Sequence, residues 1–205
     1  SKNKNLDISW LQAKPYAPWQ VSDLVKHKAC EVKWLLIVKS DDWPFKTLSS
    51  KRNLSLEILQ TYPDAGWDFG IISKNVNLQT SWIKAFPDAA WDFTLIGIYM
   101  CLDFEWAELF PEAPWRFYDI TANIKEYHKW ITKYPKVNWD YKLVLVQPDL
   151  TLDLLKIIPE EKLNFKRLSS NSALTLEWLA HFPNKPWNYG FLSRHNNFTV
   201  EWIDR

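Results

Sequence analysis

The chain has 205 residues, and its 25 Lys and Arg nearly balance its 24 Asp and Glu. This balance lacks the basic excess that is typical of nucleic-acid-binding modules, and the two Cys provide no disulfide framework and fit a reducing compartment. No stretch approaches the ~18 apolar residues that a membrane span needs, and no signal peptide is recognisable. These features predict an intracellular protein that is not secreted and has no membrane partner.

Tryptophan recurs every 24 residues in two interleaved series. The first ladder, as we name one series, holds Leu163 at one place and otherwise consists of Trp19, Trp43, Trp67, Trp91, Trp115, Trp139 and Trp187. The second ladder holds Ile58 and Leu154 at two places and otherwise consists of Trp10, Trp34, Trp82, Trp106, Trp130, Trp178 and Trp202. A fixed period predicts a tandem-repeat protein. Because Ile and Leu replace Trp without disturbing the period, we expect buried structural ladders rather than platforms for stacked bases.

The repeat divides the whole chain without a gap. In order, the units are a partial unit 1–18, full units 19–42, 43–66, 67–90, 91–114, 115–138, 139–162 and 163–186, and a partial unit 187–205. The pattern starts and stops inside a unit, which predicts that this is a piece of a longer array.

Each unit begins with a helix signal, illustrated by unit 67–90, in which Trp67 is position 0. Asp68 at position 1 is an N-cap residue in front of an apolar run, and Phe69 and Ile72 follow at positions 2 and 5. The pattern predicts a first helix over positions 2–7. Asn75 at position 8 stands where a left-handed C-terminal residue is expected.

A second helix follows in each unit, illustrated by unit 43–66. Ser55 at position 12 can cap the helix, and Glu57 at position 14 faces the positive end of its dipole. Ile58 and Tyr62, at positions 15 and 19, share one face at i, i+4 spacing. Pro63 at position 20 ends the helix near position 18 or 19.

Such short helices are unstable alone in water, where ~12–15 residues are marginal. Stacking identical units buries the aromatic side chains that a single unit leaves exposed. The predicted fold class is therefore all-α, an α-solenoid of 24-residue helix-loop-helix repeats stacked in one continuous array. Leu154 and Leu163 replace Trp at adjoining places, which predicts the least tightly packed junction around 150–165.

The sequence offers no motif for catalysis. Its four His lack metal-ligand spacing, and its four Gly form no phosphate-binding loop. We therefore expect a non-enzymatic protein with no catalytic residue, metal or cofactor. The variable positions 17 and 18 of the second helix are the candidate partner-binding surface, and neutral drift of a solvated face is the alternative: Gln60, Lys84, Glu108, Lys133, Lys156 and His181.

The unit from Trp67 to Asn75, followed by Leu78 and by Ser81, Trp82 and Ile83, resembles a known repeat. It is similar to the tryptophan-rich short tandem repeats of uncharacterised proteins from giant DNA viruses of amoebae. The resemblance covers essentially the whole chain, but the loop proline of that repeat is present only as Pro148. It implies no activity, and it implies a place in the host-cell cytoplasm or the virion.

Taken together, the patterns predict a scaffold for protein–protein interaction, in a viral structural or host-interaction role, with a partner of unknown identity. A nucleic-acid-binding solenoid is one alternative, and steeply salt-sensitive binding would identify it. A structural array that polymerises end to end is the other, since open ends with apolar faces can associate.

Overall fold

The computed structural model describes residues 6–27, 30–196 and 198–199. These residues are helical and contain no strand, only an isolated parallel bridge between Leu102 and Ile124. The predicted all-α class is confirmed. The chain divides into two compact units, Ser1–Met100 (unit 1) and Cys101–Arg205 (unit 2), which are described separately. Whether all repeats form one array stays a prediction.

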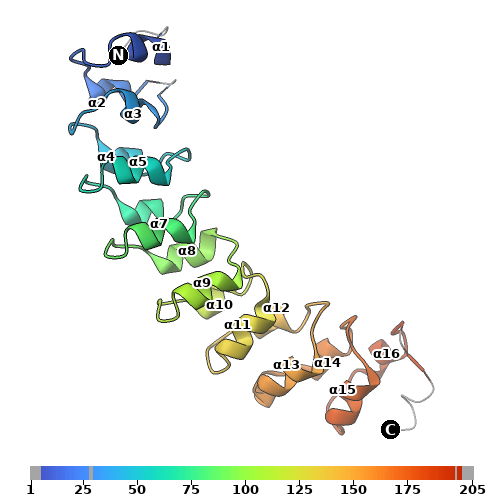
Figure 1. Cartoon of the computed structure of the whole chain (residues 1–205). Coiled ribbons are helices and arrows are strands. Elements are labelled where there is room, and N and C mark those ends of the chain that lie inside the picture. Colours follow the sequence, from blue (N-terminus) through green and yellow to red (C-terminus); the bar gives the residue numbers. More distant parts are fainter. Residues whose placement is uncertain (1–5, 28–29, 197, 200–205) are drawn as a thin grey trace. The chain divides into compact units, whose positions relative to one another are not determined.

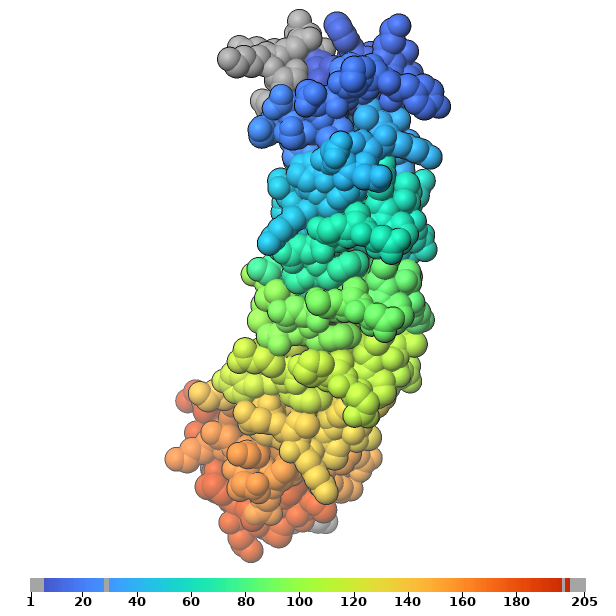
Figure 2. Space-filling view, turned by 90° about the vertical axis from the view of Figure 1, so that its left-hand side faces the viewer, coloured from blue at the N-terminus to red at the C-terminus, as the bar shows by residue number. Residues whose placement is uncertain are grey.

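Unit 1 contains pairs of short helices that follow one another along the chain (Figure 1). They are α1 (Ile8–Ala13), α2 (Val21–Leu24), α3 (Trp34–Ile37), α4 (Phe45–Leu48), α5 (Leu56–Thr61), α6 (Phe69–Ile72), α7 (Thr80–Ala85) and α8 (Phe93–Tyr99). In the space-filling view, the segments of the unit succeed one another as bands in chain order (Figure 2). Within this unit, α3 contacts α1 of the preceding repeat and α5 of the following one.

Unit 2 also consists of short helices that follow one another along the chain. Its helices are α9 (Phe104–Leu109), α10 (Phe117–Ile120), α11 (Tyr127–Lys133), α12 (Tyr141–Val144), α13 (Leu152–Ile157), α14 (Phe165–Leu168), α15 (Leu176–His181) and α16 (Tyr189–Leu192), with a 3-10 turn, η1, at Glu160–Lys162. The second helices of successive repeats are neighbours, since α11 packs against α9 on one side and α13 on the other.

The first helix of a repeat is capped as expected but is shorter than expected. The Asp68 carboxylate accepts a hydrogen bond from the Ile71 amide at 2.9 Å, and Asp92, Asn164 and Asn188 cap their helices in the same way. Asp140 caps α12 through the amide two residues later, that of Lys142. The prediction of positions 2–7 was wrong for α6, which ends at Ile72, position 5. Only α8 runs further, through Tyr99.

In four repeats a buried hydroxyl at position 6 directly follows the end of the first helix. The Ser49 hydroxyl donates to the Phe45 carbonyl at 2.9 Å and accepts from the backbone amide of Asp68, 19 residues later, at 2.9 Å. The same amide-to-hydroxyl bond recurs at Ser73, Thr121 and Ser169. This hydroxyl clasp joins the end of one first helix to the start of the next.

The Asn at position 8 also joins repeats instead of adopting the expected left-handed conformation. Among described residues, only Glu126 and Asn184 combine a side chain with positive φ, so that prediction was wrong. The Asn75 amide group instead donates to the Lys51 carbonyl, 24 residues earlier, at 3.1 Å. Its own carbonyl oxygen accepts from the Asn77 amide at 3.0 Å. The side chain thus satisfies the loop of the preceding repeat.

The second helix matches the prediction more closely. Helix α5 spans Leu56–Thr61, with Ser55 at the N-cap position and Glu57 in the first turn. The hydroxyl forms the expected cap bond at Thr151 in α13, but Ser55 and Thr175 make none. The helix that Thr199 was expected to cap lies outside the described residues.

The first-ladder tryptophans donate hydrogen bonds to carbonyl groups at the C-terminal end of the second helix. The Trp67 indole N–H donates to the Tyr62 carbonyl, five residues earlier, at 2.9 Å. The same five-residue bond is made by Trp19, Trp43, Trp91, Trp115, Trp139 and Trp187. Helix carbonyls at a C-terminus lack an intrahelical partner, so these indoles supply a hydrogen bond as well as apolar surface.

Most ladder residues are buried, as predicted, but not all. The described second-ladder Trp from Trp34 to Trp178 are buried, whereas Trp10 is 52% exposed, which contradicts the prediction. Second-ladder rings pack on the preceding repeat, as Trp130 does on Phe104, and no earlier repeat among the described residues covers Trp10. Trp19 and Trp91, in the first ladder, are only partly buried. Trp202 lies outside the described residues.

The junction around 150–165 differs in backbone rather than in burial. Ile158 has φ −69° and ψ 131°, whereas the regular Phe86 has φ −131° and ψ 65° at the same position. Leu163 has no indole N–H with which to cap α13, and the 3-10 turn η1 connects α13 to Leu163. Leu154 and Leu163 are nonetheless buried. Loose packing at this junction stays a prediction.

Candidate functional site

A regular repeat encloses three aromatic rings at the turn that leads to the next repeat. Phe45 at position 2 lies 5.3 Å from the Tyr62 ring at position 19, and 4.9 Å from the next ladder residue, Trp67, between centroids. The same set recurs around Phe69, Phe117 and Phe165. In these four repeats the aromatic trio fills the space beneath the turn.

The repeat 19–42 lacks two rings of the trio. Val21 stands at position 2 and Val38 at position 19, and both are buried. Over them lies a groove of about 790 Å³, lined by residues 15–22, 36–40 and 42. The corresponding space at the next junction, which contains Phe45 and Tyr62, is about 490 Å³. The larger groove therefore lies where two aromatic rings are replaced by valine.

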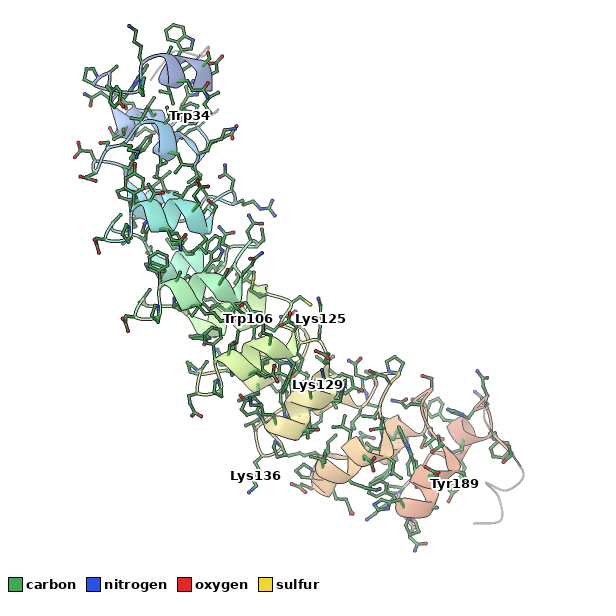
Figure 3. The ribbon with its side chains drawn as sticks, in the orientation of Figure 1. Trp34, Trp106, Lys125, Lys129, Lys136 and Tyr189 are labelled. Atoms are coloured by element: carbon green, nitrogen blue, oxygen red, sulfur yellow. The ribbon has the colours of Figure 1, made fainter. Side chains whose placement is uncertain are left out.

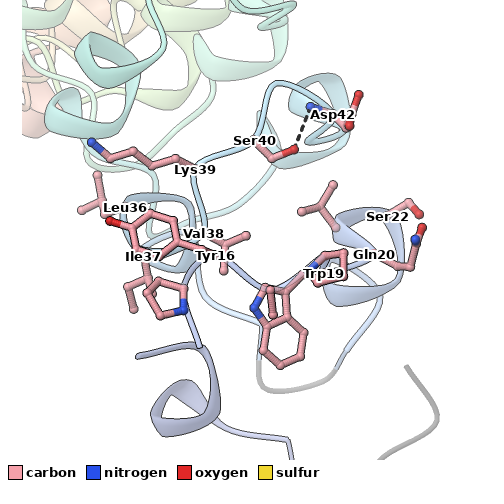
Figure 4. A pocket seen from close by; sticks show the side chains of 14 residues that line it. Tyr16, Trp19, Gln20, Ser22, Leu36, Ile37, Val38, Lys39, Ser40 and Asp42 are labelled. Atoms are coloured by element: carbon pink, nitrogen blue, oxygen red, sulfur yellow. Dashed lines mark hydrogen bonds between the residues drawn. The ribbon is translucent and has the colours of Figure 1, made fainter. Parts of the chain in front are cut away.

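The groove walls combine apolar and polar side chains. Figure 4 shows Tyr16 beside Leu36 and Ile37, with Ser40 and Asp42 away from them. The Tyr16 side chain is 98% exposed, although it is a large aromatic residue. Trp19 is held in the wall by the 2.7 Å hydrogen bond from its indole N–H to the Lys14 carbonyl. The groove thus offers an exposed phenol and a fixed indole.

Charge in the groove is nearly balanced. Lys39 and Asp42 are its charged lining residues, and both are exposed. The Ser40 hydroxyl accepts from the Asp42 amide at 3.2 Å, which orders this part of the loop. Such a lining suits the side chains of a protein segment better than a polyanion, which binds through several Lys or Arg contacts.

The six residues named as the candidate partner surface are exposed, and none of them lines this groove. The structure exposes Gln60 and Lys84 in unit 1 and Glu108, Lys133, Lys156 and His181 in unit 2. Two of them have contacts of their own: the Lys133 ammonium donates to the Ala107 carbonyl at 2.8 Å, and Lys156 pairs with Asp153 at 3.0 Å. Their role in binding stays a prediction.

The groove was missed in the sequence, although its signal was present. Leu36 and Ile37 occupy the same variable positions 17 and 18 as the predicted surface, and both line the groove. Val21 departs visibly from the aromatic residue at position 2. The signal is the loss of ring volume at two positions that are 17 residues apart but adjacent in the fold.

The titratable groups with shifted pKa do not form a catalytic set. Burial raises the pKa of the Cys30 thiol, whereas a reactive cysteine needs a lowered one. Burial, and then the 3.0 Å hydrogen bond from the Tyr127 hydroxyl to the Asp149 carboxylate, raise the pKa of Tyr127. In the described ranges, no cluster of His, Cys, Asp and Glu could hold a metal ion.

No helix within the described residues is long and apolar enough to cross a membrane. Comparisons with protein-family models, with curated proteins and with solved structures find no match. The resemblance to giant-virus repeats therefore stays a prediction.

Proposed function

We propose that the protein is an α-solenoid scaffold that binds a protein segment in the groove of repeat 19–42. The replacement of two rings by Val21 and Val38, beneath the exposed Tyr16, is the observation that carries this proposal. The missing volume is that of aromatic side chains, so the partner segment presents an aromatic residue that restores the trio. Burying such a side chain removes about 150–250 Å² from water.

The recurrent contacts between repeats support the solenoid part of the proposal. The hydroxyl clasp spans 19 residues at each of its four occurrences, and the Asn75 bond spans 24. Contacts at fixed spacing between neighbouring repeats are the pattern of a stacked array, in which each repeat is stabilised by the next. A groove at one repeat is then a local binding site on a rigid support.

The resemblance to giant-virus repeats extends the proposal to a viral structural or host-interaction protein. No feature of the groove specifically favours nucleic-acid binding or end-to-end assembly. Its lining contains one Lys and one Asp. We therefore retain a protein segment as the partner.

The test is selection from a displayed peptide library against two forms of the full chain. In the filled form, Val21→Phe and Val38→Tyr restore the regular trio, and in the control Val76→Phe adds a ring at a site that is 58% exposed and outside the groove. We expect wild type and control to enrich peptides that contain an aromatic residue, and the filled form to lose them. Equal selection by wild type and the filled form would refute the groove as the site.

A further inference from the structure

One surface of unit 2 carries exposed cations beside an exposed aromatic ring. It consists of positions 3, 4 and 7 of repeats 139–162, 163–186 and 187–205, on or directly after α12, α14 and α16. We name this surface the first-helix face, and its cations and ring are Lys142, Lys166, Arg167, Arg194 and Phe191. All five side chains are exposed, that of Phe191 to 47%.

These cations form a local excess of positive charge. Residues 162–199 contain five Lys or Arg and one carboxylate, Glu177, which lies in the first turn of α15. The ion pairs of unit 2 that the structure describes all use cations outside the face. Asp140 and Asp149 accept hydrogen bonds from a backbone amide and a tyrosine hydroxyl, and Glu161 lies in η1. Ion pairs with the described residues therefore do not neutralise the face.

Hydrogen bonds between loops make the first-helix face continuous across three repeats. The Asn171 amide group donates to the Gln147 carbonyl of the preceding repeat at 3.0 Å. In the next repeat the His195 Nε2 lies 2.9 Å from the Asn171 carbonyl, and it donates, because a carbonyl only accepts. Figure 1 shows α12, α14 and α16 along one side of unit 2 and α13 and α15 along the other.

The face contains a pocket between two of these repeats. Its volume is about 330 Å³, and it is lined by residues 169–170, 172, 191 and 194–196. None of these described residues is acidic. The Arg194 amide donates to the Phe191 carbonyl at 3.1 Å, so the guanidinium and the ring belong to one turn. The volume is close to the lower limit of about 300 Å³ for ligand pockets, which suits a group of nucleotide size.

We propose that the first-helix face binds a single-stranded nucleic acid. Phosphates of the strand contact Lys142, Lys166 and Arg167, because Lys and Arg neutralise the nucleic-acid backbone and release its counterions. At the pocket, one base stacks on the Phe191 ring while a neighbouring phosphate meets the Arg194 guanidinium. Aromatic rings beside cations bind single strands with little sequence preference, so the site accepts any base.

A strand fits this face better than a duplex, a mononucleotide or an acidic peptide. Cations that are spread over three repeats exceed the reach of one mononucleotide, and a duplex keeps its bases stacked inside, away from Phe191. An acidic peptide satisfies the cations but brings no base to stack on the ring. The site and the groove in unit 1 use different residues, so either proposal can fail without the other.

The experiment is fluorescence anisotropy of a labelled oligothymidylate, about 16 nucleotides long, titrated with the full chain. We expect binding at about 0.02 M salt, with a slope of log K against log salt of about −3, since four phosphate contacts contribute about −0.7 each. A hairpin duplex, thymidine monophosphate and polyglutamate are the competitors. Each should displace the labelled strand much less effectively than the unlabelled strand does.

Two variants separate the phosphate contacts from base stacking. Arg167→Gln with Arg194→Gln removes two phosphate contacts, so it should lower the affinity at least about tenfold and make the salt slope shallower by about 1.4. Phe191→Ala removes the stacking ring, so it should lower the affinity about tenfold and leave the salt slope unchanged.

The matched control, Lys84→Gln with Lys136→Gln, removes the same charge from two exposed sites outside the face. Figure 3 shows Lys136 away from α16, where Tyr189 is labelled. The control should bind as the wild type does. The proposal is overturned if the strand does not bind at low salt, or if any competitor matches the unlabelled strand. It is also overturned if the arginine variant, still helical by circular dichroism, binds no more weakly than the control.

Discussion

At the scale of single residues, tryptophan has two separable roles in this chain. Trp139 and Trp130 are both almost completely buried, at 1% and 0% exposure. The Trp139 N–H donates to the Tyr134 carbonyl at 3.0 Å, whereas the Trp130 N–H is a buried donor without a partner in the described structure. One ladder therefore contributes a hydrogen bond and apolar surface, and at Trp130 the other contributes apolar surface alone.

This difference predicts unequal effects of the same substitution. Trp139→Phe and Trp130→Phe remove similar ring area, but only the first leaves the Tyr134 carbonyl without its donor. We expect Trp139→Phe to lower the free energy of unfolding by about 1–2 kcal/mol more than Trp130→Phe does. Urea denaturation followed by circular dichroism measures both. Equal losses would show that the indole hydrogen bond contributes nothing net.

At the scale of helices, the hydroxyl clasp stabilises a first helix that has only four residues. Ser49 and Ser50 adjoin in sequence but differ in contacts. The buried Ser49 hydroxyl accepts a hydrogen bond from the Asp68 amide of the next repeat. The exposed Ser50 hydroxyl instead donates to the Thr47 carbonyl in its own turn. The pair is a matched test of the junction.

Removing the clasp leaves the partly buried Asp68 amide without its acceptor. We expect Ser49→Ala to lower the free energy of unfolding by about 1–3 kcal/mol, and Ser50→Ala to change it by less than about 0.5 kcal/mol, as is usual for an exposed site. Thermal and urea unfolding of the two variants would measure this. If the Ser49→Ala protein is as stable as the Ser50→Ala protein, the clasp contributes nothing to the free energy of unfolding.

The sequence predicts those features of the helices that depend on residues close together in the chain. The Asp68 cap, the first-turn Glu57 and the end of α5 before Pro63 follow from neighbours within a few residues. The clasp was not predictable in this way, because the Ser49 acceptor and the Asp68 donor are 19 residues apart. The groove was not predicted either, because it results from the absence of two aromatic rings and not from residues of a type that indicates binding.

At the scale of the whole molecule, the proposed solenoid predicts how the chain unfolds. In a stacked array each repeat contacts only its neighbours, so a local defect lowers the stability of nearby repeats first. Proteins also open in cooperative segments below the global free energy of unfolding. Ser49→Ala is such a defect, because it breaks a bond between repeats 43–66 and 67–90.

Hydrogen exchange measured by mass spectrometry should map that defect along the chain. We expect Ser49→Ala to speed exchange in the two repeats around its junction and to leave unit 2 near its wild-type rates, because no single core couples distant repeats. Thr121→Ala, which breaks the equivalent bond to Asp140, should produce the converse pattern, with faster exchange in repeats 115–138 and 139–162. Uniform acceleration across the chain by either variant would mean that all repeats unfold together, and it would count against the solenoid proposal.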